Sequence, residues 1–571
     1  MLAVVAEMNC GEVIIEVLSK IGCRYIFGTP GVHNIDVYRA LLNHHEIRHI
    51  LVKHETNAGV MADVYGRLTG EPGFLLTTAG PGATHCVTAV AQAYASASPL
   101  IHISGDVPTR ACKEPFHGLD SNDFLVNVFK PVTKWATRVK DPAEVVSTLI
   151  KAYEISTSGR MGPIHISIPI DVMRSEYKGS LQIPEPKRWR EAGRIDEIIN
   201  DLLGSKKLVV YAGKDVSRYQ CENKLLELCE ILRAPLVVHG RRGNDDVVIP
   251  HDHPLYAGFV GGFSHPAAFH ALNSADLVLS IGIRFGSVES EFLKTLHRPK
   301  YISITVENDL APNTFSNKVI VGNLKETLTL LIDRLKALPQ READETLLKQ
   351  ISQIRREVSE KIDNDIEAHL NDRPLHPGVV IKILRSALDR DSILAVDAGL
   401  SCLWVKGIYP VYCIKGIICP GGYEAMGFSL PAAITTKIVY PERNVFAVTG
   451  DGGLLMSYSD LPTIFENNLK ITVLVFNNNK YGAVWQLQKD RFEGKFIATD
   501  LQATDFAMIF RAFGGIGIRV ETIEETRKAL EEAVNSKEPT LIDIKTDFRH
   551  SAPSFRFFIQ NPKLMIGEII D

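Results

Sequence analysis

The chain has 571 residues, which is too long for one hydrophobic core and predicts two to four domains. Apolar residues make up 45%, charged residues 23%, and the formal net charge is −4, so the composition argues against a disordered chain and against nucleic acid as a partner. The nine cysteines are scattered without a Cys-x-x-Cys pair and are typical of buried residues in a reducing compartment. Glu7 and Glu12 interrupt the first apolar run and no later segment reaches transmembrane length, so we expect a soluble cytoplasmic protein that does not bind membranes.

The first block alternates helix and strand. Residues 11–22 have helical apolar spacing, and one small-residue helix is predicted over residues 83–98. Apolar runs predict strands within residues 24–31, 73–82, 99–106 and 162–171. Strands separated by helices indicate a parallel sheet covered on both faces. We place this domain at residues 1–182, followed by a polar, proline-bearing linker.

Two further blocks follow. The second, at residues 193–340, has predicted strands within residues 206–215, 234–240, 275–285, 300–309 and 317–322. A charged helix with few core positions forms a connector at residues 341–375. The third block, at residues 376–571, has strands within residues 391–399, 444–453, 471–479 and 539–546. The sequence thus predicts an α/β protein of three doubly wound parallel-sheet domains. The first and third blocks share the order of strand, glycine-rich turn and helix, which suggests internal fold duplication.

The segment from Val448 to Gly482 combines a Gly-Asp-Gly turn with a strand that ends in three asparagines. Ligands of open parallel sheets lie at the carboxyl ends of the strands, where Asp451 and Asn478 both fall. Carboxylate, amide and backbone oxygens are the hard ligands that Mg²⁺ prefers, and the glycines let the backbone approach a phosphate. A β-turn and an Asn-rich loop are each common alone, but their combination at this spacing favours a metal–phosphate site.

This segment resembles the binding motif of thiamine-diphosphate-dependent enzymes. The resemblance implies that Asp451, Asn478 and the carbonyl of Lys480 hold Mg²⁺. In "GGYEAMGFSLPAAI", Met426 matches the hydrophobic residue that wedges the cofactor into its bent conformation, although core packing is the ordinary role of a methionine. The other residues that the resemblance assigns to the cofactor are glycines and one tyrosine: Gly399, Gly450, Gly452, Gly453, Tyr481 and Gly482.

The first block resembles the pyrimidine-binding domain of the same family. In "VKHETNAGVMADVYGRLTG", Glu55 matches the glutamate that shares a proton with the pyrimidine ring of the cofactor and so starts catalysis. The alternative role of Glu55 is an ordinary acidic residue at a helix N-terminus. The third block accordingly resembles the diphosphate-binding domain, and the second resembles the central, nucleotide-binding-like domain.

The resemblance covers nearly the whole chain and is closest to acetolactate-synthase-like enzymes. It implies pyruvate or a related 2-oxo acid as substrate, a carbon–carbon bond as product, and a homodimer or homotetramer with active sites between subunits. A decarboxylase or aldehyde lyase that releases free aldehyde stays open as an alternative. A catalytically silent, nucleotide-sensing homologue is a second alternative, against which the intact Glu55, Asp451 and Asn478 argue.

Two histidines and one threonine bear on these alternatives. His33 lies in "GVHNID", which resembles benzaldehyde lyase at its catalytic histidine, and His117 stands where acetolactate synthases usually carry a glutamine. Both histidines could deliver a proton, as a decarboxylase requires, or could be loop histidines bonded to the backbone. Arg284 matches the family's FAD site, but Thr305 replaces its usual aspartate, so we expect no FAD.

Overall fold

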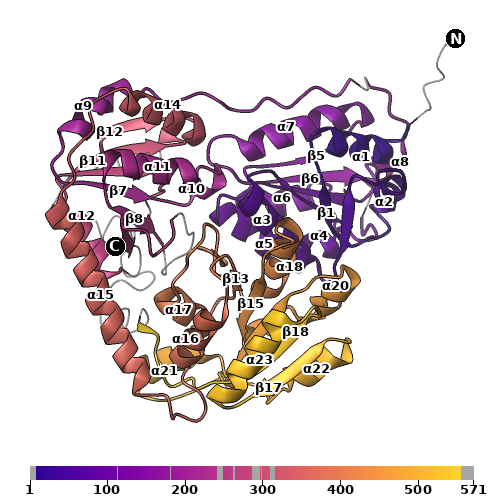
Figure 1. The fold of residues 1–571 in the computed structure, drawn as a ribbon. Helices are drawn as coiled ribbons and strands as arrows, with labels where there is room; N and C mark the ends of the chain where they lie inside the picture. The colour runs from indigo at the N-terminus through magenta and orange to yellow at the C-terminus, as the bar shows by residue number, and fades with distance from the viewer. Residues whose placement is uncertain are drawn as a thin grey trace. The chain divides into compact units, whose positions relative to one another are not determined.

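Three six-stranded parallel β-sheets, each flanked by helices, make up the fold (Figure 1). The computed structural model describes residues 8–111, 113–179, 182–240, 249–260, 264–285, 296–297, 299–308 and 316–553. The chain divides into two compact units, Met1–Trp189 and Arg190–Asp571. The first unit holds one sheet and the second unit holds two, so the predicted fold class is confirmed.

The first sheet has the strand order β2-β1-β3-β4-β6-β5. Its strands are β1 (Tyr25–Gly28), β2 (Arg48–Leu51), β3 (Gly73–Thr77), β4 (Leu100–Asp106), β5 (Trp135–Arg138) and β6 (Pro163–Pro169). Its helices are α1 (Cys10–Lys20), α2 (Ile35–Ala40), α3 (Glu55–Thr69), α4 (Pro81–His85), α5 (Val87–Ala95), α6 (Phe124–Phe129), α7 (Val145–Thr157) and α8 (Ile170–Arg174). The single helix predicted over residues 83–98 is therefore wrong. The N–H of Cys86 bonds to the carbonyl of Ala83, a tight turn that separates α4 from α5.

The central sheet has the order β12-β11-β10-β7-β8-β9, the doubly wound order of dinucleotide-binding domains. Its strands are β7 (Leu208–Ala212), β8 (Leu236–His239), β9 (Tyr256–Val260), β10 (Leu277–Ile281), β11 (Lys300–Thr305) and β12 (Ser316–Val321). Its helices are α9 (Asp196–Gly204), α10 (Asp215–Arg218), α11 (Glu222–Leu232), α12 (Pro266–Ser274) and α14 (Leu324–Lys336). The charged helix α15 (Glu345–Glu367) buries only Leu347, Ile351 and Ile366 and packs on α12, as its sequence predicts.

The third sheet has the order β14-β13-β15-β16-β18-β17, which repeats the order of the first sheet strand for strand. Its strands are β13 (Ile393–Val396), β14 (Ile417–Ile418), β15 (Val445–Gly450), β16 (Thr472–Asn477), β17 (Ile516–Val520) and β18 (Thr540–Lys545). Its helices are α16 (Pro377–Ala387), α17 (Leu400–Ile408), α18 (Ser429–Val439), α19 (Asp451–Leu454), α20 (Leu461–Glu466), α21 (Gly482–Arg491), α22 (Phe506–Ala512) and α23 (Ile523–Asn535). This shared topology agrees with the predicted fold duplication.

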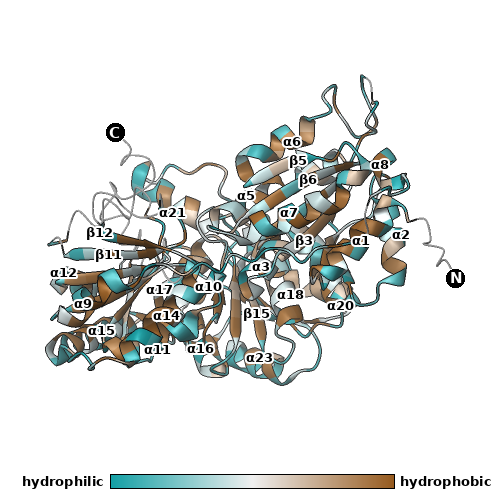
Figure 2. Ribbon diagram, turned by 90° about the horizontal axis from the view of Figure 1, so that it is seen from above, coloured by the Kyte–Doolittle hydropathy of each residue, from teal (hydrophilic) through white to brown (hydrophobic). Residues whose placement is uncertain are grey.

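Hydrophobic strands and amphipathic helices explain why these layers form. In Figure 2, β15 is largely brown whereas helices such as α15 and α23 alternate between brown and teal. Burying such strands between helices removes their apolar surface from water.

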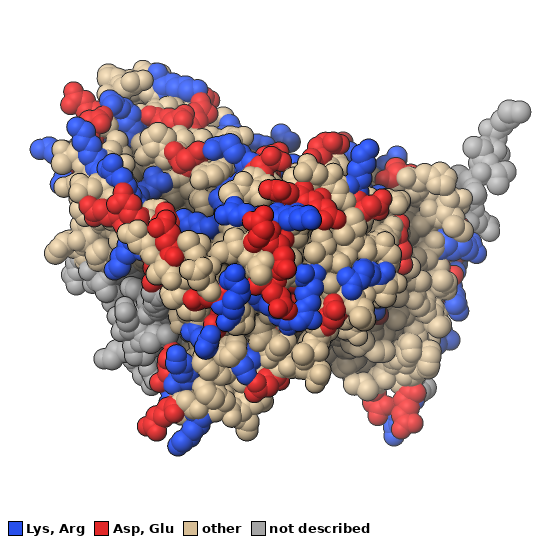
Figure 3. Space-filling model, turned by 60° about the horizontal axis from the view of Figure 1, so that its bottom comes forward, with Lys and Arg blue, Asp and Glu red and all other residues tan. Residues whose placement is uncertain are grey.

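Basic and acidic side chains are interspersed over the face of the molecule in Figure 3. Among the described residues, no helix is both long and apolar enough to span a membrane.

Candidate active site

Asp451 lies where β15 ends and α19 begins. Its side chain is 4% exposed, and its Oδ1 accepts a hydrogen bond from the backbone N–H of Gly452 at 3.0 Å. Its Oδ2 is buried without a hydrogen-bond partner among the described residues. Burial raises the pKa of this carboxyl to about 6, although nearby backbone N–H groups oppose the shift. A buried carboxylate oxygen without a partner is costly, and a bound cation would relieve that cost.

The end of β16 brings Asn478 to the same edge of the sheet. Gly450 pairs with Phe476 in the parallel ladder, so β15 and β16 end side by side. Asn477 turns away, because its amide donates to Asp543 at 2.8 Å and to the carbonyl of Thr504 at 3.1 Å. The Oδ1 of Asn478 instead accepts the N–H of Lys480 at 3.1 Å.

A cavity of about 550 Å³ opens at this edge. Every residue of the third block that the sequence predicts for the cofactor or its metal lines it: Gly399, Met426, Gly450, Asp451, Gly452, Gly453, Asn478, Lys480, Tyr481 and Gly482. The structure therefore brings together residues that lie up to 83 positions apart, from 399 to 482. The lining suits an organic diphosphate, because it includes glycines that let a phosphate approach the backbone and oxygen ligands for a cation.

Three residues of the cavity wall carry buried polar groups that were not predicted. The Ser401 Oγ, the Trp404 Nε1 and the Thr546 Oγ1 are buried, lack a hydrogen-bond partner among the described residues, and belong to residues of the cavity wall. Such groups are ready to bond a polar ligand. Ser401 and Trp404 stand in the stretch "DAGLSCLW", which directly follows a predicted strand, and that position is the signal that could have identified them.

Asp397 fixes the segment that carries Met426. The carboxylate is fully buried and accepts from the backbone N–H groups of Ala398, Gly427 and Ser429 at 2.8–3.0 Å, and from the Ser429 hydroxyl at 3.0 Å. Burial raises the pKa of Asp397, while these hydrogen bonds act in the opposite direction. The network holds residues 427–429 at the end of β13, and with them the neighbouring Met426.

In the first unit, Glu55 begins α3 after the capping residue His54. Its side chain is 17% exposed, and its Oε2 lies 2.9 Å from the Nδ1 of His85. A Cβ atom at Gly82 would lie 3.3 Å from the Oε1 of Glu55, so the glycine leaves space beside the carboxylate. His85 is therefore a direct neighbour of Glu55.

His33 and His117 lie next to each other in the same unit. Their ring centroids are 5.3 Å apart, and Phe116 stacks on His117 at 3.9 Å. The Nδ1 atom of each histidine is buried without a hydrogen-bond partner in the described part of the chain. Burial and the neighbouring His117 lower the pKa of His33, which favours its neutral form. The turn at residues 80–82 contacts both Glu55 and the carbonyl of His117.

In the central domain, Arg284 follows β10, and Thr305 is the last residue of the adjacent strand β11. Arg284 is exposed, whereas Thr305 is buried and donates to the carbonyl of Glu307 at 3.2 Å. Residues 241–248 of this domain lie outside the described residues. The expectation that FAD does not bind stays a prediction.

The three sheets and the lined cavity define the class of thiamine-diphosphate-dependent enzymes. The N-terminal and C-terminal thiamine pyrophosphate binding domains match residues 8–125 and 397–544, and the central domain of these enzymes matches residues 195–331. The probable acetolactate synthase large subunit of Methanocaldococcus jannaschii is 31% identical over 96% of this chain and 93% of its own. The acetolactate synthase isozyme 3 large subunit of Escherichia coli is 30% identical over 95% of each chain. The chain thus belongs to the thiamine pyrophosphate enzymes, in their acetolactate-synthase-like group.

Proposed function

We propose that this enzyme is a Mg²⁺-dependent carboligase that takes pyruvate or a related small 2-oxo acid, releases carbon dioxide and forms a carbon–carbon bond. The observation that carries the proposal is the buried Oδ2 of Asp451, which has no hydrogen-bond partner among the described residues and belongs to a cavity that Asn478 and Lys480 also line. Relatives whose names state acetolactate synthase support the type of reaction.

Each group of residues that lines the cavity has a role in this proposal. Asp451, the Asn478 amide oxygen and the Lys480 carbonyl hold Mg²⁺ against the diphosphate, while Met426 supports the bent cofactor. The remaining predicted residues surround the diphosphate: Gly399, Gly450, Gly452, Gly453, Tyr481 and Gly482. When bound, thiamine diphosphate supplies the carbon nucleophile that adds to the 2-oxo acid and accepts the electrons released with carbon dioxide.

Glu55 exchanges a proton with the pyrimidine ring, and we propose that it does so across a subunit boundary. The chain then works as a cytoplasmic homodimer or homotetramer, and a single subunit is inactive. The eight described cysteines are free, which fits a reducing compartment.

Mixing and reassociating the inactive variants Glu55→Gln and Asp451→Ala tests whether each active site takes residues from two subunits, because a hybrid dimer would then regain one intact site. No recovery of activity after verified subunit exchange would contradict this arrangement.

His33 and His117 support the second candidate function, a decarboxylase or lyase that releases free aldehyde. In the described part of the chain, the Nδ1 atoms of these adjacent rings have no hydrogen-bond partner, so either ring could protonate the reacting carbon before an acceptor carbonyl reaches it. In that case His117→Gln shifts the products toward carboligation, because glutamine keeps a hydrogen bond but delivers no proton.

Product analysis separates these functions. The purified enzyme is incubated with a panel of 2-oxo acids, with and without an added aldehyde, and products are identified by mass spectrometry. We expect a hydroxyketone or 2-hydroxy-3-oxo acid product from at least one donor. Free aldehyde alone from every donor would favour the second function, and no turnover of any donor would favour the silent, nucleotide-sensing homologue.

A further inference from the structure

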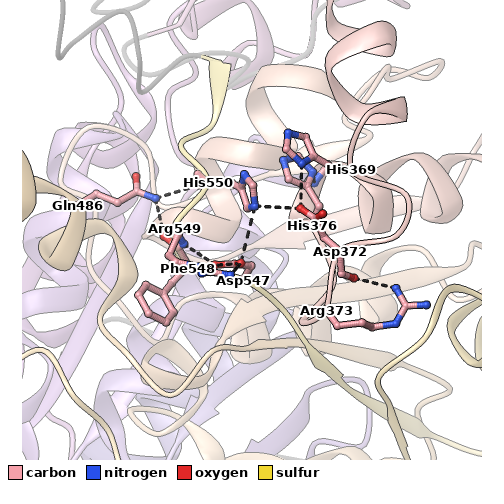
Figure 4. A network of polar contacts seen from close by, with 10 residues as sticks. His369, Asp372, Arg373, His376, Gln486, Asp547, Phe548, Arg549 and His550 are labelled. Carbon is pink, nitrogen blue, oxygen red and sulfur yellow. Dashed lines mark hydrogen bonds and ion pairs between the residues drawn. The ribbon is translucent and has the colours of Figure 1, made fainter.

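Three histidines gather in the second unit, apart from the residues discussed so far. His369 follows α15, His376 caps α16, and His550 follows β18. One ring nitrogen of each lies within 4.8 Å of the others, and the ring centroids are 4.3–4.7 Å apart. Figure 4 shows the three rings converging above Asp372.

Two of the histidines face one carboxylate oxygen. The Oδ2 of Asp372 lies 2.8 Å from the Nδ1 of His369 and 3.3 Å from the Nε2 of His550. Ligands of a four-coordinate Zn²⁺ at ~2.0–2.1 Å from the metal are about 3.3 Å apart, so these separations are close to those of a metal site. The Oδ2 of Asp547 lies 3.7 Å from the same His550 nitrogen, but Arg549 pairs with this carboxylate and balances its charge.

His376 has a different role, which its tautomer determines. Its Nδ1 accepts the N–H of Gly378 at 3.1 Å, so the proton of the neutral ring is on Nε2. The side chain is fully buried, and Nε2 has no hydrogen-bond partner among the described residues. This N–H is available to a water or anion in the cluster, but it is not a metal ligand.

The backbone around the cluster is tightly held. Leu375 donates to the carbonyl of Lys545 at 3.1 Å, and Asp547 donates to the carbonyl of Leu375 at 2.9 Å. The buried amide of Gln486 donates to the carbonyls of Phe548 and His550 at 2.7 and 2.9 Å. These bonds hold the two segments together, so the candidate ligands do not have to be ordered first when a cation binds.

We propose that His369, His550 and Asp372 bind a divalent transition-metal ion, with Zn²⁺ as the best match. His376 donates its Nε2–H to the water that completes the tetrahedral shell. Imidazole ligands distinguish this site from the oxygen-only Mg²⁺ site proposed at Asp451. Pro377, next to His376, and Trp404, whose ring lies 5.0 Å from that of His376, both line the cofactor cavity, so the metal would stabilise that cavity wall.

Metal titration tests the proposal. The full chain, purified without a histidine tag and stripped by a chelator, is loaded with Mg²⁺ and thiamine diphosphate and titrated with Zn²⁺ by calorimetry and with Co²⁺ by visible absorption. We expect about one equivalent of Zn²⁺ per chain and the d–d bands of tetrahedral Co²⁺. His369→Ala and His550→Gln should each weaken binding by about 100-fold or more, and His376→Ala by ~10–100-fold.

Control variants separate this site from others. His270→Ala removes a histidine of the same unit that bonds to Gln350, and it should bind Zn²⁺ like the wild type. Asp451→Ala should also keep Zn²⁺, so loss of the proposed Mg²⁺ site and loss of this site are distinguishable. Far-ultraviolet circular dichroism confirms that each variant is folded. No saturable Zn²⁺ binding, or equal loss in His270→Ala, would overturn the proposal and leave an ion-pair network around Asp372.

Discussion

Asp397 is expected to control cofactor affinity without touching the cofactor. In Asp397→Asn, the amide oxygen can still accept from Ala398 and Gly427, but the NH₂ group faces the N–H of Ser429. One unmatched buried N–H costs about 1–3 kcal/mol. This cost destabilises the conformation of residues 427–429, which hold Met426 in place. If the cofactor binds only to that conformation, thiamine diphosphate binds about 5–150-fold more weakly. Asp397→Ala leaves three backbone N–H groups without their acceptor and should weaken binding further.

Calorimetric titration with thiamine diphosphate at saturating Mg²⁺ measures this effect. The control is Asp106→Asn, since Asp106 is also buried and accepts a backbone N–H, from Val107 at 2.8 Å, but does not line the cavity. We expect the control to destabilise the fold while changing cofactor affinity much less. Wild-type affinity in a folded Asp397→Asn variant would refute the reasoning.

Three other predictions concern the metal and a second cofactor. Asp451→Ala should abolish binding of both Mg²⁺ and thiamine diphosphate, because the diphosphate would face the sheet edge without its cation; unchanged affinity by calorimetry would remove Asp451 from the site. Burial raises the pKa of Asp451 from 3.8 to about 6, so the ionised carboxylate destabilises the cofactor-free protein by about 3 kcal/mol well above pH 6. This penalty decreases as the pH falls and disappears below about pH 3, where the carboxyl is protonated in both the folded and the unfolded state. Cofactor-free Asp451→Asn should therefore melt at a higher temperature than the wild type at pH 7 and at the same temperature near pH 3; a pH-independent difference would argue against the shift. The purified protein should show no stoichiometric flavin absorbance, because Thr305 replaces the usual aspartate, and one flavin per chain would show this prediction to be wrong.

Central strands were predictable from sequence, whereas most edge strands were not. The five strands that no predicted apolar run covers are β2, β5, β9, β14 and β17, and each lies at the edge of its sheet. Central strands are buried on both faces and are continuous apolar runs. The edge strand β2 reads Arg-His-Ile-Leu with only Ile50 buried, so no such run marks it. Although β9 is fully buried, its sequence, Tyr-Ala-Gly-Phe-Val, contains a glycine that weakens the strand pattern.

The part of the candidate site that was predictable is the part whose residues lie close together in the sequence and have side chains that suit a metal. Asp451 and Asn478 follow adjacent strands, so the sheet brings them together. Thr546 lies 68 positions after Asn478, and His369 and His550 are 181 positions apart; only the folded chain shows that such residues are neighbours. Free hydrogen-bonding atoms, such as the Ser401 Oγ, are likewise visible only after every possible partner has been placed.

Hydrogen–deuterium exchange at C2 of bound thiamine diphosphate tests the central claim most directly, because it reports proton transfer before any substrate binds. We predict exchange much faster than in the free cofactor for the wild type, and slower by orders of magnitude in Glu55→Gln with the cofactor still bound, since an amide cannot share the ring proton. Near-ultraviolet circular dichroism of the bound cofactor checks occupancy in both proteins. Exchange in the wild type at the rate of the free cofactor, or equal rates in the two proteins, would contradict the account.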